Sequence, residues 1–206
     1  MTIQAEHHHD QDGQGRLFNA VYNFSMLFGR GGMARAVADL ADISPNDVVV
    51  DVGCGPGSAA RIARRAGASR VLGIDPSPDM LRLARWVSSF RRTDGVAFLE
   101  GSAESLPVVS SSATVVWALQ SVHHWVDRSK GLAESRRILT PEGRLILLEG
   151  DVAPGVRGHS KHGLTDQQAD ELAALVGRSG FSNVTKRAVR TRRRKFVAIT
   201  ASVAPS

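Results

Sequence analysis

The sequence contains little of what several classes of protein require. Its 206 residues include one cysteine, Cys54, so there is no partner for an intramolecular disulfide and no set of thiolates for a metal cage. No apolar run approaches the roughly 18 residues of a membrane helix, and the longest runs, such as Ala113–Leu119, fit buried strands. Residues 1–15 lack the basic-then-apolar layout of a signal peptide, so we expect a cytoplasmic protein with no membrane partner.

Acidic residues are absent after position 185, where basic residues concentrate. The segment KRAVRTRRRK (186–195) holds seven of the 26 Lys and Arg residues. The other 19 are balanced by 20 Asp and Glu, so this one segment accounts for the net charge of +6. The charge is therefore local, and its meaning depends on where the fold places it.

Apolar runs and amphipathic stretches alternate from residue 45 onward. The apolar runs predict strands at Val48–Val52, Val71–Ile74, Val96–Leu99, Thr114–Leu119, Arg144–Leu148, Asn183–Val189 and Lys195–Ser202. The stretches between them predict helices at Ser58–Ala66, Pro78–Val87, Ser129–Leu139 and Thr165–Arg178. Strands separated by helices indicate an α/β fold with a doubly wound, seven-stranded, mostly parallel sheet, completed by a C-terminal antiparallel hairpin.

The chain divides into three segments on this pattern. Residues 1–15 are polar and contain glycine, which predicts a flexible tail. Residues 16–44 predict two helices ahead of the sheet, one with apolar residues at helical spacing from Leu17 to Phe28 and one over Met33–Leu40. Residues 45–206 form the main domain.

A glycine-rich segment, VDVGCGPGS, joins the first predicted strand to the helix that follows. Glycine tolerates positive φ and lets a ligand approach the backbone, so Gly53, Gly55 and Gly57 can form a ligand-binding turn. The helix behind the turn offers unpaired N–H groups at its start. The spacing G-x-G-x-G departs from the dinucleotide fingerprint, because Ser58 stands at the third glycine position of that pattern.

A carboxylate ends the second predicted strand. Asp75 stands where ribose hydroxyls are bound in nucleotide folds. Together with GSAESLP after the third strand, this order resembles class I S-adenosylmethionine (SAM) methyltransferases, within them the small-molecule, ubiquinone/menaquinone-biosynthesis-like branch with a type 11 methyltransferase domain. The motifs, which cover roughly residues 45–202, are DVGCGPG, GIDPSPDML, GSAESLP, SVHHWVD and LTPEGRLILLE. The resemblance implies a Rossmann-like fold, SAM as cofactor and S-adenosylhomocysteine as product.

The resemblance also implies roles for residues around the glycine turn. Asp51, Gly53 and Gly55 would lie along the methionine part of SAM, with Gly55 and Gly57 letting it approach the backbone. Asp75 would hold the ribose. For Asp75 the alternative is that it only caps the helix after Ser77.

A second set of residues would hold the adenine. Met80 would cover one face of the ring, unless it is an ordinary core residue, and the Ala103 N–H would contact the ring edge. Ser102 departs from the family, which usually has Asp at this position to accept from the adenine amine. A neutral hydroxyl accepts more weakly, so adenine recognition would lean on Ala103, Glu104 or water.

Two histidines follow the fourth predicted strand. An alcohol must lose a proton as it is methylated, and a neutral imidazole suits that role near pH 7. We therefore expect His123 or His124 to be the catalytic base, and the sequence does not choose between them. The alternative is that one ring bonds the backbone while Trp125 packs into the core.

Further candidates would line the substrate space. Glu149 ends the fifth predicted strand, His159 and His162 follow it, and Tyr22 belongs to residues 16–44, which would act as lid helices. These groups would orient hydroxyls of the substrate. Glu149 with the histidines would also suit a divalent ion, but their spacing is loose and we expect no metal site.

The predicted topology also indicates where the basic segment lies in the fold. A parallel sixth strand would bring the turn Arg190–Arg194, with Arg192 at its centre, to the edge of the sheet that carries the cofactor loops. We expect this turn to attract an acidic or phosphorylated acceptor. The alternative is a charged turn that keeps a sheet edge soluble.

The leading functional hypothesis is O-methylation of a small hydroxylated metabolite, such as a sugar, a polyketide or another secondary metabolite. C-methylation of a quinone-like ring is the alternative within the fold. An RNA-binding protein or RNA methyltransferase using the Arg-rich tail is disfavoured, because only 5 % of residues are aromatic and no RNA-binding appendage is present. The Ser102 departure keeps open an inactive SAM-binding regulator. The sequence carries no signal for the oligomeric state.

Overall fold

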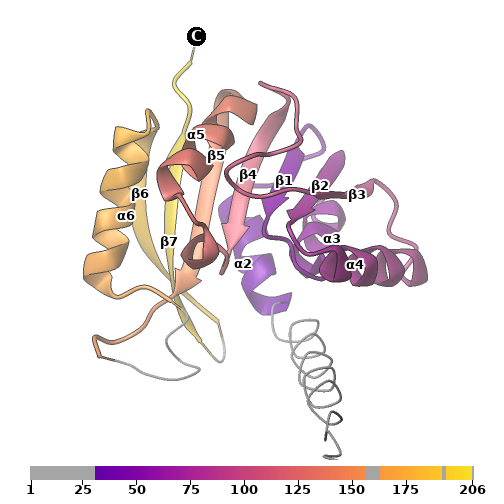
Figure 1. Ribbon diagram of the computed structural model, residues 1–206, viewed down its shortest axis with the longest axis horizontal. Helices are drawn as coiled ribbons and strands as arrows, with labels where there is room; N and C mark the ends of the chain where they lie inside the picture. Colours follow the sequence, from indigo (N-terminus) through magenta and orange to yellow (C-terminus); the bar gives the residue numbers. More distant parts are fainter. Residues whose placement is uncertain (1–30, 156–162, 192–193, 206) are drawn as a thin grey trace, which may run out of the picture.

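The computed structural model describes residues 31–155, 163–191 and 194–205. Seven strands form one sheet in the order β3-β2-β1-β4-β5-β7-β6 (Figure 1). They are β1 (Val48–Val52), β2 (Arg70–Asp75), β3 (Val96–Glu100), β4 (Ala113–Leu119), β5 (Leu139–Gly150), β6 (Ser182–Arg190) and β7 (Lys195–Ser202). The helices are α2 (Gly31–Leu40), α3 (Ser58–Arg65), α4 (Pro78–Phe90), the short 3-10 helix η1 (Val122–His124), α5 (Arg128–Ile138) and α6 (Asp166–Arg178).

The predicted topology is confirmed. Strands β1 to β5 are parallel, β7 is antiparallel to β5, and β6 is antiparallel to β7. The chain runs outward from β1 through β2 to β3 and then returns to the other side of β1 as β4. The order of the strands therefore switches between β1 and β4, and ligands bind beyond the carboxyl ends of strands at such a point.

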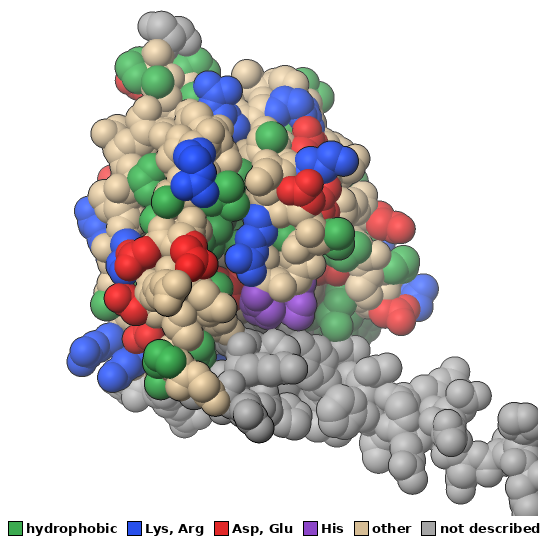
Figure 2. All heavy atoms as spheres, turned by 60° about the vertical axis from the view of Figure 1, so that its left-hand side comes forward, with side chains coloured by type: hydrophobic (Ala, Val, Ile, Leu, Met, Phe, Trp, Pro, Cys, Tyr) green, Lys and Arg blue, Asp and Glu red, His purple; other side chains and the backbone are tan. Residues whose placement is uncertain are grey.

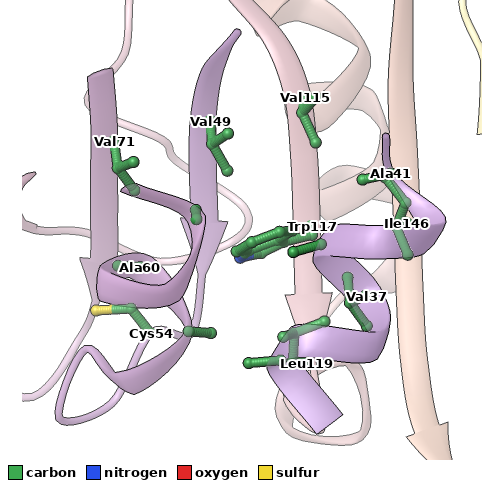
Figure 3. Packing of buried hydrophobic residues seen from close by; sticks show 14 of the residues in the cluster. Val37, Ala41, Val49, Cys54, Ala60, Val71, Val115, Trp117, Leu119 and Ile146 are labelled. Carbon is green, nitrogen blue, oxygen red and sulfur yellow. The ribbon is translucent and has the colours of Figure 1, made fainter. Parts of the chain in front are cut away.

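Two hydrophobic layers cover the sheet. On one face α2, α3 and α4 enclose a cluster in which Val37 and Ala60 pack towards Val49 and the fully buried Trp117 (Figure 3). On the other face α5 and α6 contribute apolar residues such as Leu132 and Leu172. Burial on both faces explains why the parallel strands are apolar without alternation.

Local signals set the starts of two helices as predicted. The Ser77 hydroxyl accepts from the Met80 N–H ahead of α4, and Pro78 occupies the first helical position. At α6, Thr165 and Gln168 form a capping box. The predicted helix over Met33–Leu40 is present as α2, which begins at Gly31, whereas residues 1–30 lie outside the described part of the chain.

Strand β5 is longer than predicted. The sequence Thr140-Pro141-Glu142-Gly143 indicated a turn before a strand over Arg144–Leu148, but β5 already begins at Leu139. Leu139 pairs with Ala113 and Arg144 with Val115, so residues 140–143 bulge opposite the partner strand, with a φ of 61° at Glu142. The turn-forming residues are thus absorbed as an irregularity within the strand.

Candidate active site

A cavity of about 340 Å³ opens at the switch point, beyond the carboxyl ends of β1, β2 and β4. Its volume lies within the range of about 300–1,000 Å³ that is typical of small-molecule sites. The lining residues are Val52, Gly53, Gly55, Asp75, Pro76, Met80, Gly101, Ser102, Ala103, Glu104, Gln120, Ser121, His124, Trp125 and Val126. Six of the seven residues that the sequence suggested for a cofactor are among them, and the exception is Asp51.

The glycine turn presents bare backbone to this cavity. Gly53 and Gly55 have φ values of 73° and 52°, and the Gly53 N–H donates to the Ile74 carbonyl at 2.8 Å. A Cβ atom built on Gly53 would lie 2.5 Å from Cβ of Ser121, whose hydroxyl donates to the Val52 carbonyl. The turn is therefore packed closely against the end of β4, and only glycine fits at position 53.

Gly57 does not line the cavity. A Cβ atom there would come within 2.6 Å of the Phe98 ring, so this glycine allows the start of α3 to pack against β3. The expectation that it admits a ligand is thus replaced by a role in packing.

Asp75 joins the glycine turn to β2 and α4. Its Oδ2 accepts from the Gly55 N–H at 2.8 Å, and its Oδ1 accepts from the Ser77 N–H at 2.9 Å. A carboxylate has about four acceptor positions, so these two bonds leave capacity for hydroxyl donors in the cavity. Asp75 therefore caps the turn before α4 and also lines the cavity, which unites the two interpretations of the sequence.

Glu104 connects two loops that line the cavity, the loop after β3 and the loop after β4. Its Oε1 accepts from the Val126 N–H at 2.8 Å and from the Asp127 N–H at 3.1 Å. Partial burial raises the pKa of Glu104, but hydrogen bonds from these N–H groups and from the Ser102 hydroxyl outweigh that effect and hold it below its usual value. An ionised Glu104 therefore fixes the loop after β3 to the loop after β4.

His123 is held by a buried carboxylate. Its Nδ1 lies 2.8 Å from Oε2 of Glu149, and the other carboxylate oxygen accepts from the Val122 N–H at 2.9 Å. The Glu149 side chain is 1 % exposed and that of His123 is 15 % exposed. The expectation that Glu149 faces the substrate space is wrong: it sits in the interior and reaches the site through His123.

His124 lies on the cavity wall, with its ring centroid 4.0 Å from that of His123. The two described histidines reach the surface as one purple patch (Figure 2). Trp125 also lines the cavity and packs against Gly131 of α5. The arrangement thus places one imidazole on the cavity wall and a second, oriented imidazole beside it.

The family model described as "Methyltransferase domain" matches residues 50–147, which include the glycine turn, Asp75 and both histidines. The chain is 37 % identical over 121 residues to a demethylmenaquinone methyltransferase of Deinococcus radiodurans, and the match covers 58 % of this chain and 49 % of that protein. It is 32 % identical over 123 residues to 27-O-demethylrifamycin SV methyltransferase of Amycolatopsis mediterranei, covering 59 % and 45 %. Residues 50–147 therefore match the methyltransferase-domain family, and the resemblance to SAM-dependent methyltransferases holds over that region.

The fold also has a solved counterpart. A SAM-dependent methyltransferase from Aquifex aeolicus superimposes with a TM-score of 0.73 at 16 % identity, covering 96 % of this chain and 100 % of that one. At that identity the likeness concerns the fold alone. The chain spans about half, or less, of the length of the curated relatives it matches.

The residues that line the cavity fit SAM, the cofactor that the resemblance to SAM-dependent methyltransferases implies. Bare glycine backbone at positions 53 and 55 leaves room for close approach, and Asp75 retains acceptor capacity for ribose hydroxyls. Met80 and Ala103 also line the cavity, where Met80 supplies an apolar side chain. Asp51 is buried behind the turn, near Cys54 and Arg61 rather than on the cavity surface.

Several of the predicted substrate residues lie outside the described part of the chain, namely Tyr22, His159, His162 and Arg192. The flanks of the basic turn are described. Arg190 pairs with Lys195, and Gly150 at the end of β5 pairs with Phe196, so this turn leaves the sheet at the edge that carries the cavity, as expected.

The described residues offer neither a metal cluster nor a membrane-spanning helix. They contain no group of three or more His, Cys, Asp and Glu residues arranged to hold a metal ion. Within the same residues, no helix combines the length and the apolar content of a membrane span.

Sequence reasoning missed two features of the candidate site. Ser121, which packs against Gly53, stands two residues after the end of β4, and this position near a strand end is the only local signal for it. Arg61 lies in the second turn of α3, where the sequence resembles any exposed helical arginine, yet the side chain is buried.

Proposed function

We propose that this protein transfers the methyl group of SAM to a hydroxyl group of a small molecule, with His123 as general base. The pairing of His123 Nδ1 with the buried Glu149 carboxylate carries this proposal. A neutral imidazole that donates from Nδ1 keeps Nε2 as a proton acceptor. Glu149 therefore selects the tautomer that a base requires, as carboxylates do for histidines in other active sites.

The cofactor is held by the glycine turn and Asp75 in this proposal. Gly53 and Gly55 lie along its methionine part, with Asp51 behind them, and Asp75 accepts from its ribose. Met80, Ser102 and Ala103 surround the adenine. When bound, SAM supplies a methyl group that is already activated on a sulfonium, so the protein has to align the acceptor and remove its proton.

His123 removes that proton in the proposed reaction. The acceptor hydroxyl would give its proton to Nε2 of His123 while its oxygen bonds to the methyl carbon and the bond from that carbon to the sulfonium sulfur breaks, so that S-adenosylhomocysteine would be the leaving group. The Glu149 carboxylate then stabilises the imidazolium that results. His124 and Trp125, on the cavity wall, help to enclose the reacting groups and to exclude water.

An acidic or phosphorylated acceptor is the second part of the proposal. Arg190 and Arg194 flank a turn at the cavity-bearing edge of the sheet, and no acidic residue follows them in the chain. Their charge would raise the local concentration of an anionic acceptor. Arg190→Gln combined with Arg194→Gln should then raise KM for the acceptor and leave SAM affinity unchanged.

C-methylation of a quinone-like ring is the competing function, supported by the identity to demethylmenaquinone methyltransferase. The two are separated by incubating the protein with ¹³C-methyl SAM and pools of hydroxylated metabolites or quinols. The carbon resonance of the product distinguishes an O-methyl from a C-methyl group. O-methylation that His123→Ala abolishes supports the proposal, and C-methylation by both proteins contradicts it.

A further inference from the structure

Arg61 is a buried cation beneath the glycine turn. Among the described residues it is the only basic side chain in the interior, with 4 % of its surface exposed. It projects from the second turn of α3, the helix that begins directly after Gly57. A buried charge is costly unless it is hydrogen-bonded and balanced, so its contacts call for explanation.

The guanidinium holds the turn through a backbone carbonyl. Its Nη1 donates to the Pro56 carbonyl at 2.8 Å, the shortest of its hydrogen bonds, and lies 3.5 Å from the Ser88 hydroxyl. Nη2 lies 3.5 Å from the Ser58 hydroxyl. A Cβ atom on Gly57 would come within 3.1 Å of Nη1, so the guanidinium fills the space directly below the turn.

Arg61 forms no contact ion pair with a described carboxylate. The Asp51 carboxylate acts on it electrostatically. Burial, followed by the nearby cations Arg91 and Arg65, lowers the pKa of Arg61 to about 10, so the side chain remains protonated at neutral pH. Arg61 and Asp51 are therefore opposite charges behind the same turn.

We propose that Arg61 is a positioning residue for the amino-acid end of SAM, an assignment that rests on the cofactor site proposed above. By holding the Pro56 carbonyl it keeps the turn in the conformation that presents Gly53 and Gly55 to the ligand. Its charge also stabilises the Asp51 carboxylate behind the methionine part. The adenosine part, bound by Asp75 and the loops after β3 and β4, does not depend on it.

Two ligands test this division. S-adenosylhomocysteine contains both parts, whereas 5′-methylthioadenosine lacks the amino-acid end. Affinities of both are measured by calorimetry for wild type, Arg61→Met, Arg61→Lys and the control Ser88→Ala, which loses a contact of Arg61 but none of the turn. Thermal melting confirms that each variant is folded.

Arg61→Met is expected to weaken S-adenosylhomocysteine binding at least about tenfold, the effect of losing one charge-assisted hydrogen bond. Its affinity for 5′-methylthioadenosine should change less than about threefold, and Arg61→Lys, which keeps the charge, should fall between Arg61→Met and wild type. Ser88→Ala should match wild type.

Equal losses for both ligands, or no loss for either, in the folded variants would overturn the proposal. If Arg61→Met does not fold, the ratio of the two affinities in Arg61→Lys decides, and an unchanged ratio overturns it. Failure of the wild type to bind either ligand would overturn the cofactor site itself, and this proposal with it.

Discussion

Nδ1 of His123 lies 2.8 Å from Oε2 of Glu149, although the two residues are far apart in the sequence. Glu149 lies at the carboxyl end of β5, and His123 lies in η1, just after the carboxyl end of the parallel neighbour β4. The sheet thus supplies a carboxylate–imidazole pair beside the cavity at the switch point. If His123 is the base, a change at Glu149 should therefore lower the rate of methyl transfer.

Glu149→Gln should lower kcat by about 10- to 100-fold, because an amide no longer fixes the Nδ1–H tautomer of His123. Affinity for S-adenosylhomocysteine should be unchanged, since Glu149 does not line the cavity. Methylation rates and calorimetry on the same preparations check both statements. His124→Ala provides the comparison: His124 does line the cavity, so its loss should act on ligand affinity. A kcat that Glu149→Gln leaves unchanged would remove His123 from the role of base.

Gly53→Ala should destabilise the protein by about 1–3 kcal/mol through backbone strain, with a further cost because the new Cβ would collide with Ser121. Urea unfolding measures the loss. Gly155→Ala is the matched control, because Gly155 has a similar φ of 79° but nothing within 4 Å of a built Cβ. A larger loss at position 53 than at position 155 isolates the crowding, and equal losses would show that Ser121 moves away freely.

Because of Asp47, the free energy of unfolding should fall as the pH is lowered into the acid range. Burial raises the pKa of Asp47, but hydrogen bonds from the Thr114 hydroxyl, the Ser44 N–H and Arg144 outweigh it and hold the value below 3.8. The ionised form therefore stabilises the fold fully above about pH 5, and this contribution disappears as the pH falls through the lower folded-state pKa. Urea denaturation curves recorded at pH values from roughly 2 to 7 should show this loss as a lower free energy of unfolding.

The variant Asp47→Asn should be less stable than wild type at pH 7 and should lose less on acidification. Asp79→Asn is the control, since Asp79 forms an exposed pair with Arg82, and such pairs contribute little. If wild type and Asp47→Asn had parallel pH profiles, the buried carboxylate would not be the source of the acid sensitivity.

Cys54 should resist alkylation in the native protein. Burial, together with the nearby Asp51 and Asp75 carboxylates, raises the pKa of the Cys54 thiol well above its usual value, and the thiolate is the reactive form. Because the chain has a single cysteine, labelling with iodoacetamide at pH 8 reports on this site alone. The rate should be far slower than in urea, whereas equal rates would mean that the glycine turn opens readily.

The sequence predicted those parts of the molecule that have local causes. Val48–Val52 and the glycine turn form a strand and a tight turn because β-branched residues and glycines allow little else, and Ser77 and Thr165 cap helices through bonds to residues three positions away. The parallel order and the closing hairpin follow from the same alternation of elements.

Features that depend on contacts between distant segments could not be predicted. Glu149 was expected in the substrate space, but its orientation is fixed by the Val122 N–H and by His123, both in η1 after the neighbouring strand β4. The Arg61 guanidinium is buried between the Pro56 carbonyl of the glycine turn and the Ser88 hydroxyl of α4, which no spacing within α3 reveals. The extension of β5 to Leu139 likewise depends on pairing with Ala113.

Calorimetric titration of S-adenosylhomocysteine into the wild-type protein and Asp75→Ala tests the central claim most directly. The wild type should bind one ligand per chain, and Asp75→Ala should bind at least about tenfold more weakly, because it loses both the ribose acceptor and the anchor of the Gly55 N–H. Absence of binding by the wild type, or equal affinity in the two proteins, would contradict the account.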